Sequence, residues 1–144
     1  MGKIDQAVAE ARTWLGTPYL HQGSLKHRGV DCLGLLRGVY REIYNRDTPD
    51  PIDYSPDWGE AEGEERMRAA AFKYLEPVPL SSMGFGCVIL IRWKKGRIAK
   101  HSMIMTSDKT AIHAYNNSPV SEINLNKWWL SRVAYAFTWP EELE

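Results

Sequence analysis

The sequence predicts an α+β domain in which N-terminal helices pack on an antiparallel β-sheet. Its first half places apolar residues at helical spacing between loops. Its second half changes to short apolar runs separated by turn sequences, which is typical of meandering strands. Helices followed by strands favour an α+β fold over an alternating parallel one. A chain of 144 residues is expected to form one domain over residues 1–144.

Three segments of the first half have the periodicity of amphipathic helices. The first covers residues 3–15 and is expected to end at the glycine and proline that follow it. After a loop over residues 16–30, the second covers residues 32–45, and its sequence GLLRG contains small residues four apart, which is typical of close packing. Prolines between residues 49 and 56 indicate a loop, and residues 61–75 form a third, more charged helix before the sequence EPVP stops it.

Four segments of the second half are predicted as strands. Residues 87–93 and 97–106 flank the hairpin sequence KKGR. Residues 110–115 follow the short polar turn SDK, and residues 133–139 form the last strand. The sequence WKKGR is interpreted as a solvated hairpin tip. The sequence KWWLSR is interpreted as a packed aromatic edge, although tryptophans flanked by cations could also form a docking surface.

Composition excludes several classes of function. The 18 basic residues balance 18 acidic ones without any run of like charge, so nothing attracts nucleic acid electrostatically. No apolar run is long enough to span a membrane, and the N-terminus lacks the features of a signal peptide. We therefore expect synthesis in the cytoplasm and two reduced cysteines. Because the cysteines and histidines match no metal-ligand spacing, we expect no metal and no cofactor.

The first cysteine stands where a helix begins. Asp31 suits the N-cap, because its carboxylate can accept a backbone N–H of the first turn. Cys32 is then the first helical residue, where the helix dipole lowers the pKa of a thiol and favours a nucleophilic thiolate. The Asp31 charge opposes this effect, so a cationic histidine would be needed as partner. The alternative is that Cys32 is a small apolar filler, as we expect for Cys87 within its strand.

Two of the four histidines are predicted to meet on neighbouring strands. If residues 107–109 form a three-residue hairpin loop, His113 lies opposite Met103, diagonal to His101 and on the same side of the sheet. A two-residue turn would place the two histidines on opposite faces. With the longer loop, one imidazole can orient the other, which gives a nucleophile, a base and an orienting group. The alternative for either histidine alone is a surface or core position.

The sequence segments WLGTPYLHQGS, VDCLGLLRGVYRE, KHSMIM, AIHAY, WW and AFTWP occur in the order found in a known family. They resemble the NlpC-type papain-like cell-wall peptidases, and most of all the branch encoded by tailed phages and gene transfer agents. The similarity extends from about Trp14 to Pro140. It implies a papain-like fold for the whole of this segment.

The resemblance also implies a role for each site residue. Cys32 would be the nucleophile, His101 the general base and His113 the residue that orients the base. Tyr19 would stand in the pocket wall, and we expect Tyr19 and Asp31 to bind substrate. The sequence departs from the family pattern at two places, with Gly-Cys in place of Gly-Asp before the first core strand and His-Ser-Met in place of His-Val-Gly at the base. Met103, in the His-Ser-Met segment, is expected to narrow the space beside the base.

The resemblance implies hydrolysis of peptidoglycan stem peptides, often at the bond between γ-D-glutamyl and a diamino acid. Members of the phage branch are components of tail tips or baseplates. The expected partners are therefore the peptide substrate and tail or baseplate proteins, in a particle tail that acts at the target cell wall. Two alternatives stay open. The chain could be a structural tail module that no longer cuts, or an acyltransferase that passes the thioester intermediate to an amine or alcohol.

Overall fold

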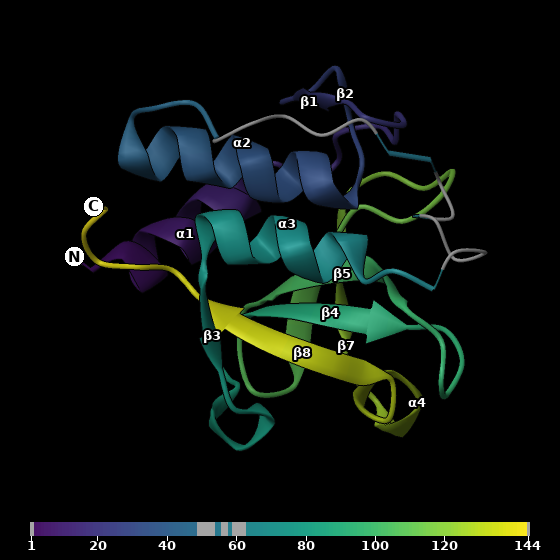
Figure 1. The fold of residues 1–144 in the computed structure, drawn as a ribbon. Coiled ribbons are helices and arrows are strands. Elements are labelled where there is room, and N and C mark those ends of the chain that lie inside the picture. Colours follow the sequence, from purple (N-terminus) through teal and green to yellow (C-terminus); the bar gives the residue numbers. More distant parts are fainter. Residues whose placement is uncertain (1, 49–53, 56–57, 59–62, 144) are drawn as a thin grey trace.

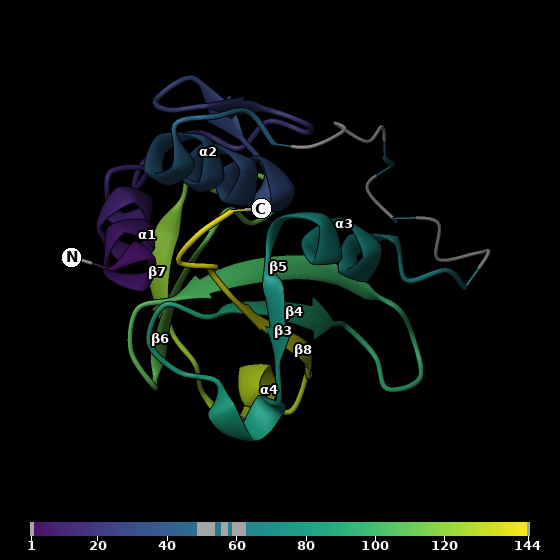
Figure 2. The ribbon, with the colours of Figure 1, turned by 60° about the vertical axis from the view of Figure 1, so that its left-hand side comes forward.

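The computed structural model describes residues 2–48, 54–55, 58 and 63–143. The described helices are α1 (Lys3–Arg12), α2 (Cys32–Tyr44), α3 (Arg66–Tyr74) and α4 (Lys127–Leu130), and residues Leu80–Ser82 form the 3-10 turn η2. In Figures 1 and 2, helices α1, α2 and α3 lie together on one face of a β-sheet, and the short helix α4 lies on the opposite side. Within the described ranges, no helix has the length and apolar character needed to cross a membrane.

The main sheet has six strands, and every pair in it is antiparallel. Its strands are β3 (Glu76–Val78), β4 (Val88–Arg92), β5 (Ala99–Met105), β6 (Thr110–His113), β7 (Ser121–Asn124) and β8 (Val133–Thr138). Strands β4 to β7 form a meander, and β8 returns to lie between β3 and β4. A separate hairpin joins β1 (Ser24–Leu25) to β2 (Gly29–Val30). The predicted α+β class with an antiparallel sheet is confirmed.

Two strands and the small hairpin were not predicted. The sequence EPVP was expected only to stop a helix, but its first three residues form β3 at the edge of the sheet. An edge strand tolerates a proline, because the missing N–H need not pair. Strand β7 alternates between half-buried and exposed positions, and its polar composition hides this pattern. The hairpin β1–β2 lies in the segment predicted as a loop.

The sheet buries both of its faces. In β4, Val88 and Leu90 join the core beneath α1, α2 and α3, whereas Ile89 and Ile91 join a second cluster on the opposite face. This explains why the strand is a continuous apolar run and not an alternating one. Cys87 is buried in the second cluster, which confirms its predicted place in the core.

Helix α1 ends at Arg12, earlier than the predicted boundary at residue 15. The Thr13 hydroxyl donates to the Glu10 carbonyl over 2.6 Å, and the chain turns there so that Trp14 is buried against α2. Helix α2 agrees with its predicted bounds, and α3 lies within the predicted segment 61–75. The predicted loop over residues 49–56 falls mostly outside the described residues.

The two glycines of GLLRG permit close packing, as predicted. A Cβ at Gly34 would lie 1.7 Å from the carbonyl oxygen of Gly23, and one at Gly38 would lie 2.2 Å from the ring of Trp14. Helix α2 is thus in direct contact with the loop that precedes β1 and with the end of α1. This packing holds the start of α2 in place.

Candidate active site

The predicted N-cap of α2 is confirmed. The Asp31 carboxylate accepts the backbone N–H of Gly34 over 2.7 Å, and Cys32 is the first residue of the helix. Asp31 itself has an extended backbone, as N-cap residues do. The thiol is therefore carried on a rigid element, at the end where the positive pole of the helix dipole lies.

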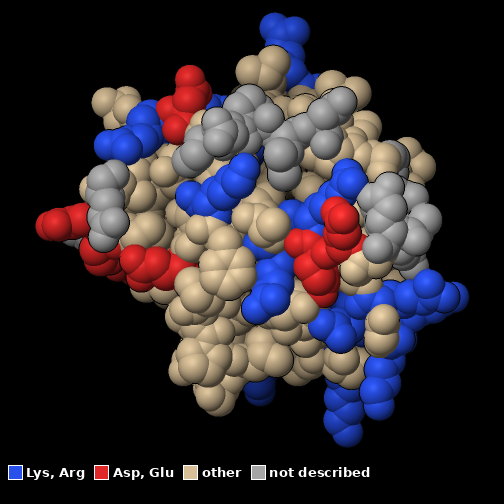
Figure 3. All heavy atoms as spheres, in the orientation of Figure 1, with Lys and Arg blue, Asp and Glu red and all other residues tan. Residues whose placement is uncertain are grey.

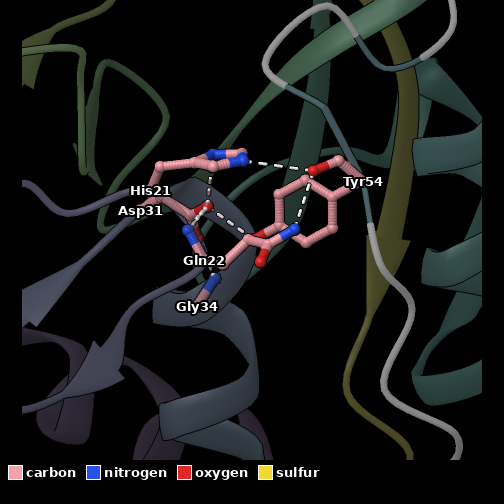
Figure 4. A network of polar contacts seen from close by, with 5 residues as sticks. All are labelled: His21, Gln22, Asp31, Gly34 and Tyr54. Atoms are coloured by element: carbon pink, nitrogen blue, oxygen red, sulfur yellow. Dashed lines mark hydrogen bonds and ion pairs between the residues drawn. The ribbon is translucent and has the colours of Figure 1, made fainter.

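Asp31 is also the centre of a polar network, drawn in Figure 4. Its Oδ2 accepts the Tyr54 hydroxyl over 2.5 Å and the Gln22 backbone N–H over 2.7 Å, and it lies 3.8 Å from His21 Nδ1. The Tyr54 carbonyl in turn accepts hydrogen bonds from the Gln22 amide and the His21 ring. With 2% of its surface exposed, Asp31 ties two loops to the start of α2. Its predicted contact with substrate stays a prediction.

The two predicted histidines meet. His101 Nε2 lies 2.8 Å from His113 Nδ1. The Thr106 N–H bonds to the Thr110 carbonyl across a three-residue loop, and Met105 pairs with Ala111, so the predicted register is confirmed. The longer of the two loop alternatives is the one that the structure shows.

A cavity of about 390 Å³ is lined by residues from both the helical half and the sheet half of the molecule. The helical half contributes Tyr19, His21, Asp31, Cys32, Tyr54 and Trp58, and the sheet half contributes Trp93, Lys100, His101, Ala114, Tyr115 and Asn116. A bulge in the β4–β5 ladder at Ile91 and Arg92 directly precedes the pairing of His101. Bulges increase the local twist of a strand and often re-aim a side chain beside a functional site.

The resting thiol differs from the expected thiolate. Burial and, to a smaller extent, the neighbouring Asp31 charge together raise the pKa of Cys32 to about 12. Hydrogen bonding from Ser102 and from the Leu33 N–H lowers this pKa without offsetting the increase. The helix dipole is therefore outweighed, because Cys32 is only 9% exposed. At neutral pH the sulfur carries its proton.

The histidines are neutral as well. Burial and the neighbouring His113 hold the pKa of His101 well below its ordinary value, and burial lowers the pKa of His113 to about 4. The rings of Trp93 and Tyr115 stack on them, with centroids 5.3 Å from His101 and 5.7 Å from His113 respectively. Neither histidine is thus a cationic partner for Cys32 at rest, which corrects the expectation of an ion pair with histidine.

The hydrogen bond between the rings restricts their tautomers. A proton must lie between His101 Nε2 and His113 Nδ1. If His101 donates it, His101 Nδ1 is left with a lone pair and can accept a proton from the thiol. If His113 donates it, His101 Nδ1 carries a hydrogen and cannot act as a base. Base catalysis therefore requires the first arrangement.

The family of the protein follows from its sequence as well as from this geometry. The NlpC/P60 family matches residues 16–137, which include each of the described residues that line the cavity, as well as His113. The chain belongs to the NlpC/P60 family. No match was found among the curated proteins.

Solved structures show the same fold. The NlpC/p60 domain of the peptidoglycan hydrolase SagA superimposes with a TM-score of 0.63 at 23% identity, covering 94% of this chain and 97% of that one. A lipoprotein-like NLP/P60 protein from Staphylococcus aureus gives 0.64 at 18%, and an NlpC/P60 protein from Bacillus cereus gives 0.66 at 21%. Each of these two matches covers 94% of this chain. This chain spans only 41% of the length of the first protein and 40% of the length of the second. The papain-like fold expected from the sequence is thereby confirmed.

Several residues of this NlpC/P60 site were not identified from the sequence. Tyr54 lies in a segment with no recognisable motif, and only the fold brings it to the cavity. The interpretation of WKKGR as a solvated hairpin tip agrees with residues 94–97, which are exposed, but not with Trp93, which is half-buried and lines the cavity. Ser102 lies beside the Cys32 sulfur, and its buried hydroxyl makes no hydrogen bond to nitrogen or oxygen among the described residues. Met103, expected to narrow the site, is instead buried in the second hydrophobic cluster and does not line the cavity.

Tyr19 lines the cavity as expected and keeps its proton. Burial raises the pKa of its hydroxyl, and the proximity of Asp31 and Cys32 raises it further. The neutral phenol can therefore donate a hydrogen bond into the cavity. In the described part of the chain, no cluster of three His, Cys, Asp or Glu side chains is placed to hold a metal ion.

Proposed function

We propose that this protein is a cysteine peptidase that hydrolyses amide bonds in peptidoglycan stem peptides. One observation carries the proposal. Cys32, at the start of α2, shares a cavity with His101, whose ring is hydrogen-bonded to His113. A nucleophile, a base and an orienting group are the components of amide hydrolysis by a thiol. Membership of the NlpC/P60 family and the likeness to the domain of a peptidoglycan hydrolase support the choice of substrate.

The first step starts from a neutral pair. As Cys32 Sγ attacks the substrate carbonyl carbon, its proton passes to His101 Nδ1, which becomes an imidazolium. His113 accepts the hydrogen bond from Nε2 throughout and keeps the ring in the productive orientation. Because both groups are neutral at rest, the reaction does not begin from a preformed ion pair.

The negative charge that develops on the substrate oxygen needs hydrogen-bond donors. At the start of α2, Gly34 donates to the Asp31 side chain and Leu35 donates to the Asp31 carbonyl. The Cys32 N–H has no such partner among the described residues, and it points out of the helix with the dipole behind it. Together with the Tyr19 hydroxyl, it forms the proposed oxyanion site.

The second step releases both products. The His101 imidazolium gives its proton to the leaving amine as the carbon–nitrogen bond breaks, and a thioester to Cys32 is left. His101 then takes a proton from water, which attacks the thioester, and it returns this proton to the sulfur as the carbon–sulfur bond breaks, which releases the free acid and restores the thiol. The same imidazole thus acts in turn as acid and as base.

The bond and the place of action are proposed from the sequence resemblance alone. The bond is that between γ-D-glutamyl and a diamino acid, and the place is the tail or baseplate of a phage or gene transfer agent particle that meets the target cell wall. Detection of the protein in purified particles would support this location. Its absence from such particles, with the protein present in the producing cell, would contradict it.

A second candidate is a structural tail module that keeps the fold and does not cut. The burial of Cys32 and its raised pKa favour this alternative, because a buried neutral thiol is a poor nucleophile. The two candidates predict different effects of His101 on the reactivity of the Cys32 sulfur. If His101 is a working base, its replacement slows alkylation of Cys32, whereas in a silent module the rate is unchanged.

The decisive experiment is mass spectrometry of muropeptides after incubation of purified cell walls with the protein. We expect new cleavage products with the wild type and none with Cys32→Ala, while the thermal unfolding of the two differs little. Cys87→Ala is the matched control, because that cysteine is buried in the core away from the cavity. Cleavage retained by Cys32→Ala would refute the assignment, and the masses of the products would identify the bond.

A further inference from the structure

A second cavity shares the lining residue Trp93 with the catalytic one. It has a volume of about 570 Å³, and Trp93 lines both cavities. Among the described residues that line it, three are cations, Arg92, Lys95 and Arg132, and none carries a carboxylate. In Figure 3, Lys and Arg side chains gather over the β4–β5 hairpin and α4, where these residues lie. We refer to it as the basic cavity.

The cations of the basic cavity are not neutralised by the protein. In the described part of the chain, none of the three forms a salt bridge. Arg132 is held in place by hydrogen bonds to the carbonyls of Trp93 and Trp128 and by the ring of Trp128, 3.9 Å from its guanidinium carbon. Its charge is thus positioned by neutral groups only, which leaves it available to an anion.

Arg92 provides a second observation. Its Nε is buried and has no hydrogen-bond partner among the described residues. Glu65 lines a neighbouring cavity with Arg92, but its carboxylate accepts hydrogen bonds from the Ala99 N–H and the Tyr135 hydroxyl. A buried donor without an acceptor is unfavourable, and because Arg92 lines the basic cavity, a small movement of its side chain would let a carboxylate bound there accept from it.

Trp93, which lines both cavities, is in contact with the proposed base. The Trp93 ring stacks on His101, with centroids 5.3 Å apart and planes inclined by 25°. In the proposed reaction His101 protonates the leaving amine, so the leaving-group side of the peptide must lie beside this stack. An extended chain advances roughly 3.3–3.6 Å per residue, so about two to three residues suffice to cross the tryptophan.

We propose that the basic cavity binds a carboxylate on the leaving-group side of the peptide substrate. The inference rests on the proposed function, because that function fixes which end of the substrate lies beside His101. The ligand class is an acidic peptide whose C-terminal part carries a free carboxylate. Arg92 and Arg132 offer guanidinium groups, whose planar donors suit a carboxylate, and Lys95 adds a charge at the rim.

The test compares two synthetic substrates on the full-length chain. Both contain γ-D-glutamyl linked to a diamino acid and a following D-alanine, one ending in a carboxylate and the other in a carboxamide. For the wild type we expect a KM roughly ten- to a hundredfold lower for the carboxylate, with a similar kcat, as one charge-assisted hydrogen bond would give. Lys95→Gln and Arg92→Gln should each reduce this preference. Lys94→Gln is the matched control, since Lys94 is on the same hairpin but does not line the cavity.

Each outcome decides one of the two proposals. Hydrolysis of both peptides with equal KM would overturn the basic cavity as a carboxylate site and leave the proposed function intact. If neither peptide is cleaved, the proposed function fails, and calorimetric binding of the same two peptides becomes the readout. Tighter binding of the carboxylate that is weakened by Lys95→Gln would support the site, whereas equal or undetectable binding would overturn it. Lys95 is exposed, so this variant keeps its fold even if Arg92→Gln does not.

Discussion

His101 Nε2 and His113 Nδ1 lie 2.8 Å apart on neighbouring strands, and this contact determines whether His101 can act as a base. Only the tautomer in which His101 donates to His113 leaves Nδ1 free to take the thiol proton. His113 is therefore a positioning residue, because it acts through another side chain. Its contribution should appear in the rate of the chemical step and not in substrate binding.

Replacement of His113 tests this role. We expect His113→Ala to lower kcat by roughly 10²-fold or more, the lower end of what acid–base catalysis contributes, with KM nearly unchanged. His113→Gln should recover part of the loss, because its side-chain oxygen can accept the same hydrogen bond. Steady-state kinetics on a stem-peptide substrate would measure both. A purely structural role would instead lower the thermal stability of both variants and spare kcat in the folded fraction.

The buried histidines should make the protein sensitive to acid. Burial lowers the pKa of His113 from an ordinary 6.5 to about 4. Between these two pH values the unfolded chain binds a proton at His113 that the folded chain does not bind. Above pH 6.5 this has no effect, and the free energy of unfolding falls as the pH drops from 6.5 towards 4. For His113 alone the loss is about 2 kcal/mol at pH 5. His101 acts in the same direction.

Denaturant unfolding at pH 7 and pH 5 would measure this loss. His113→Gln cannot titrate and should lose less stability between the two pH values than the wild type does. The lowered pKa of Glu122 adds acid sensitivity chiefly below its ordinary value of 4.5, and it is common to both proteins. Equal losses in wild type and variant would show that His113 is not buried in its neutral form.

The parts of the site that could be predicted from sequence depend on local rules. An aspartate before an apolar helical pattern identified the N-cap, and with it the position of Cys32. The period of two along a strand, together with a three-residue turn, identified the meeting of His101 and His113. Both inferences need only the geometry of one element or of one hairpin.

The parts that could not be predicted depend on contacts between distant segments. Tyr54 bonds to Asp31 from a loop whose own sequence does not determine where it lies. The pKa of Cys32 is set mainly by burial, which the packing of α2 against the sheet determines, so the helix dipole alone predicted the wrong direction. Trp93 follows β4 directly, and only the folded sheet shows that it stacks on His101.

The charge of Asp31 should restrain the reactivity of Cys32. Its proximity raises the pKa of the thiol, so Asp31→Asn should lower that pKa while an asparagine still caps the helix. We expect the iodoacetamide alkylation of Cys32 to become faster and to rise at lower pH than in the wild type. Peptide mapping by mass spectrometry follows Cys87 in the same sample as an internal reference. A profile for Cys32 that does not move would show that the Asp31 charge has no influence on the sulfur.

Gly34 and Gly38 lie on the same face of α2 but support different neighbours, so their alanine variants should differ in activity. Each would place a Cβ too close to its neighbour, and overpacking costs about 1–3 kcal/mol, of which the better helix propensity of alanine returns about 1 kcal/mol. Denaturant unfolding should show both losses, with Glu42→Ala on the exposed side of α2 as control. Of the two variants, only Gly34→Ala displaces the backbone of Gly23, which follows the Gln22 N–H that binds Asp31. Under conditions in which both variants are folded, only Gly34→Ala should therefore lose activity. Equal activity of the two variants would mean that the loop before β1 does not position the catalytic cavity.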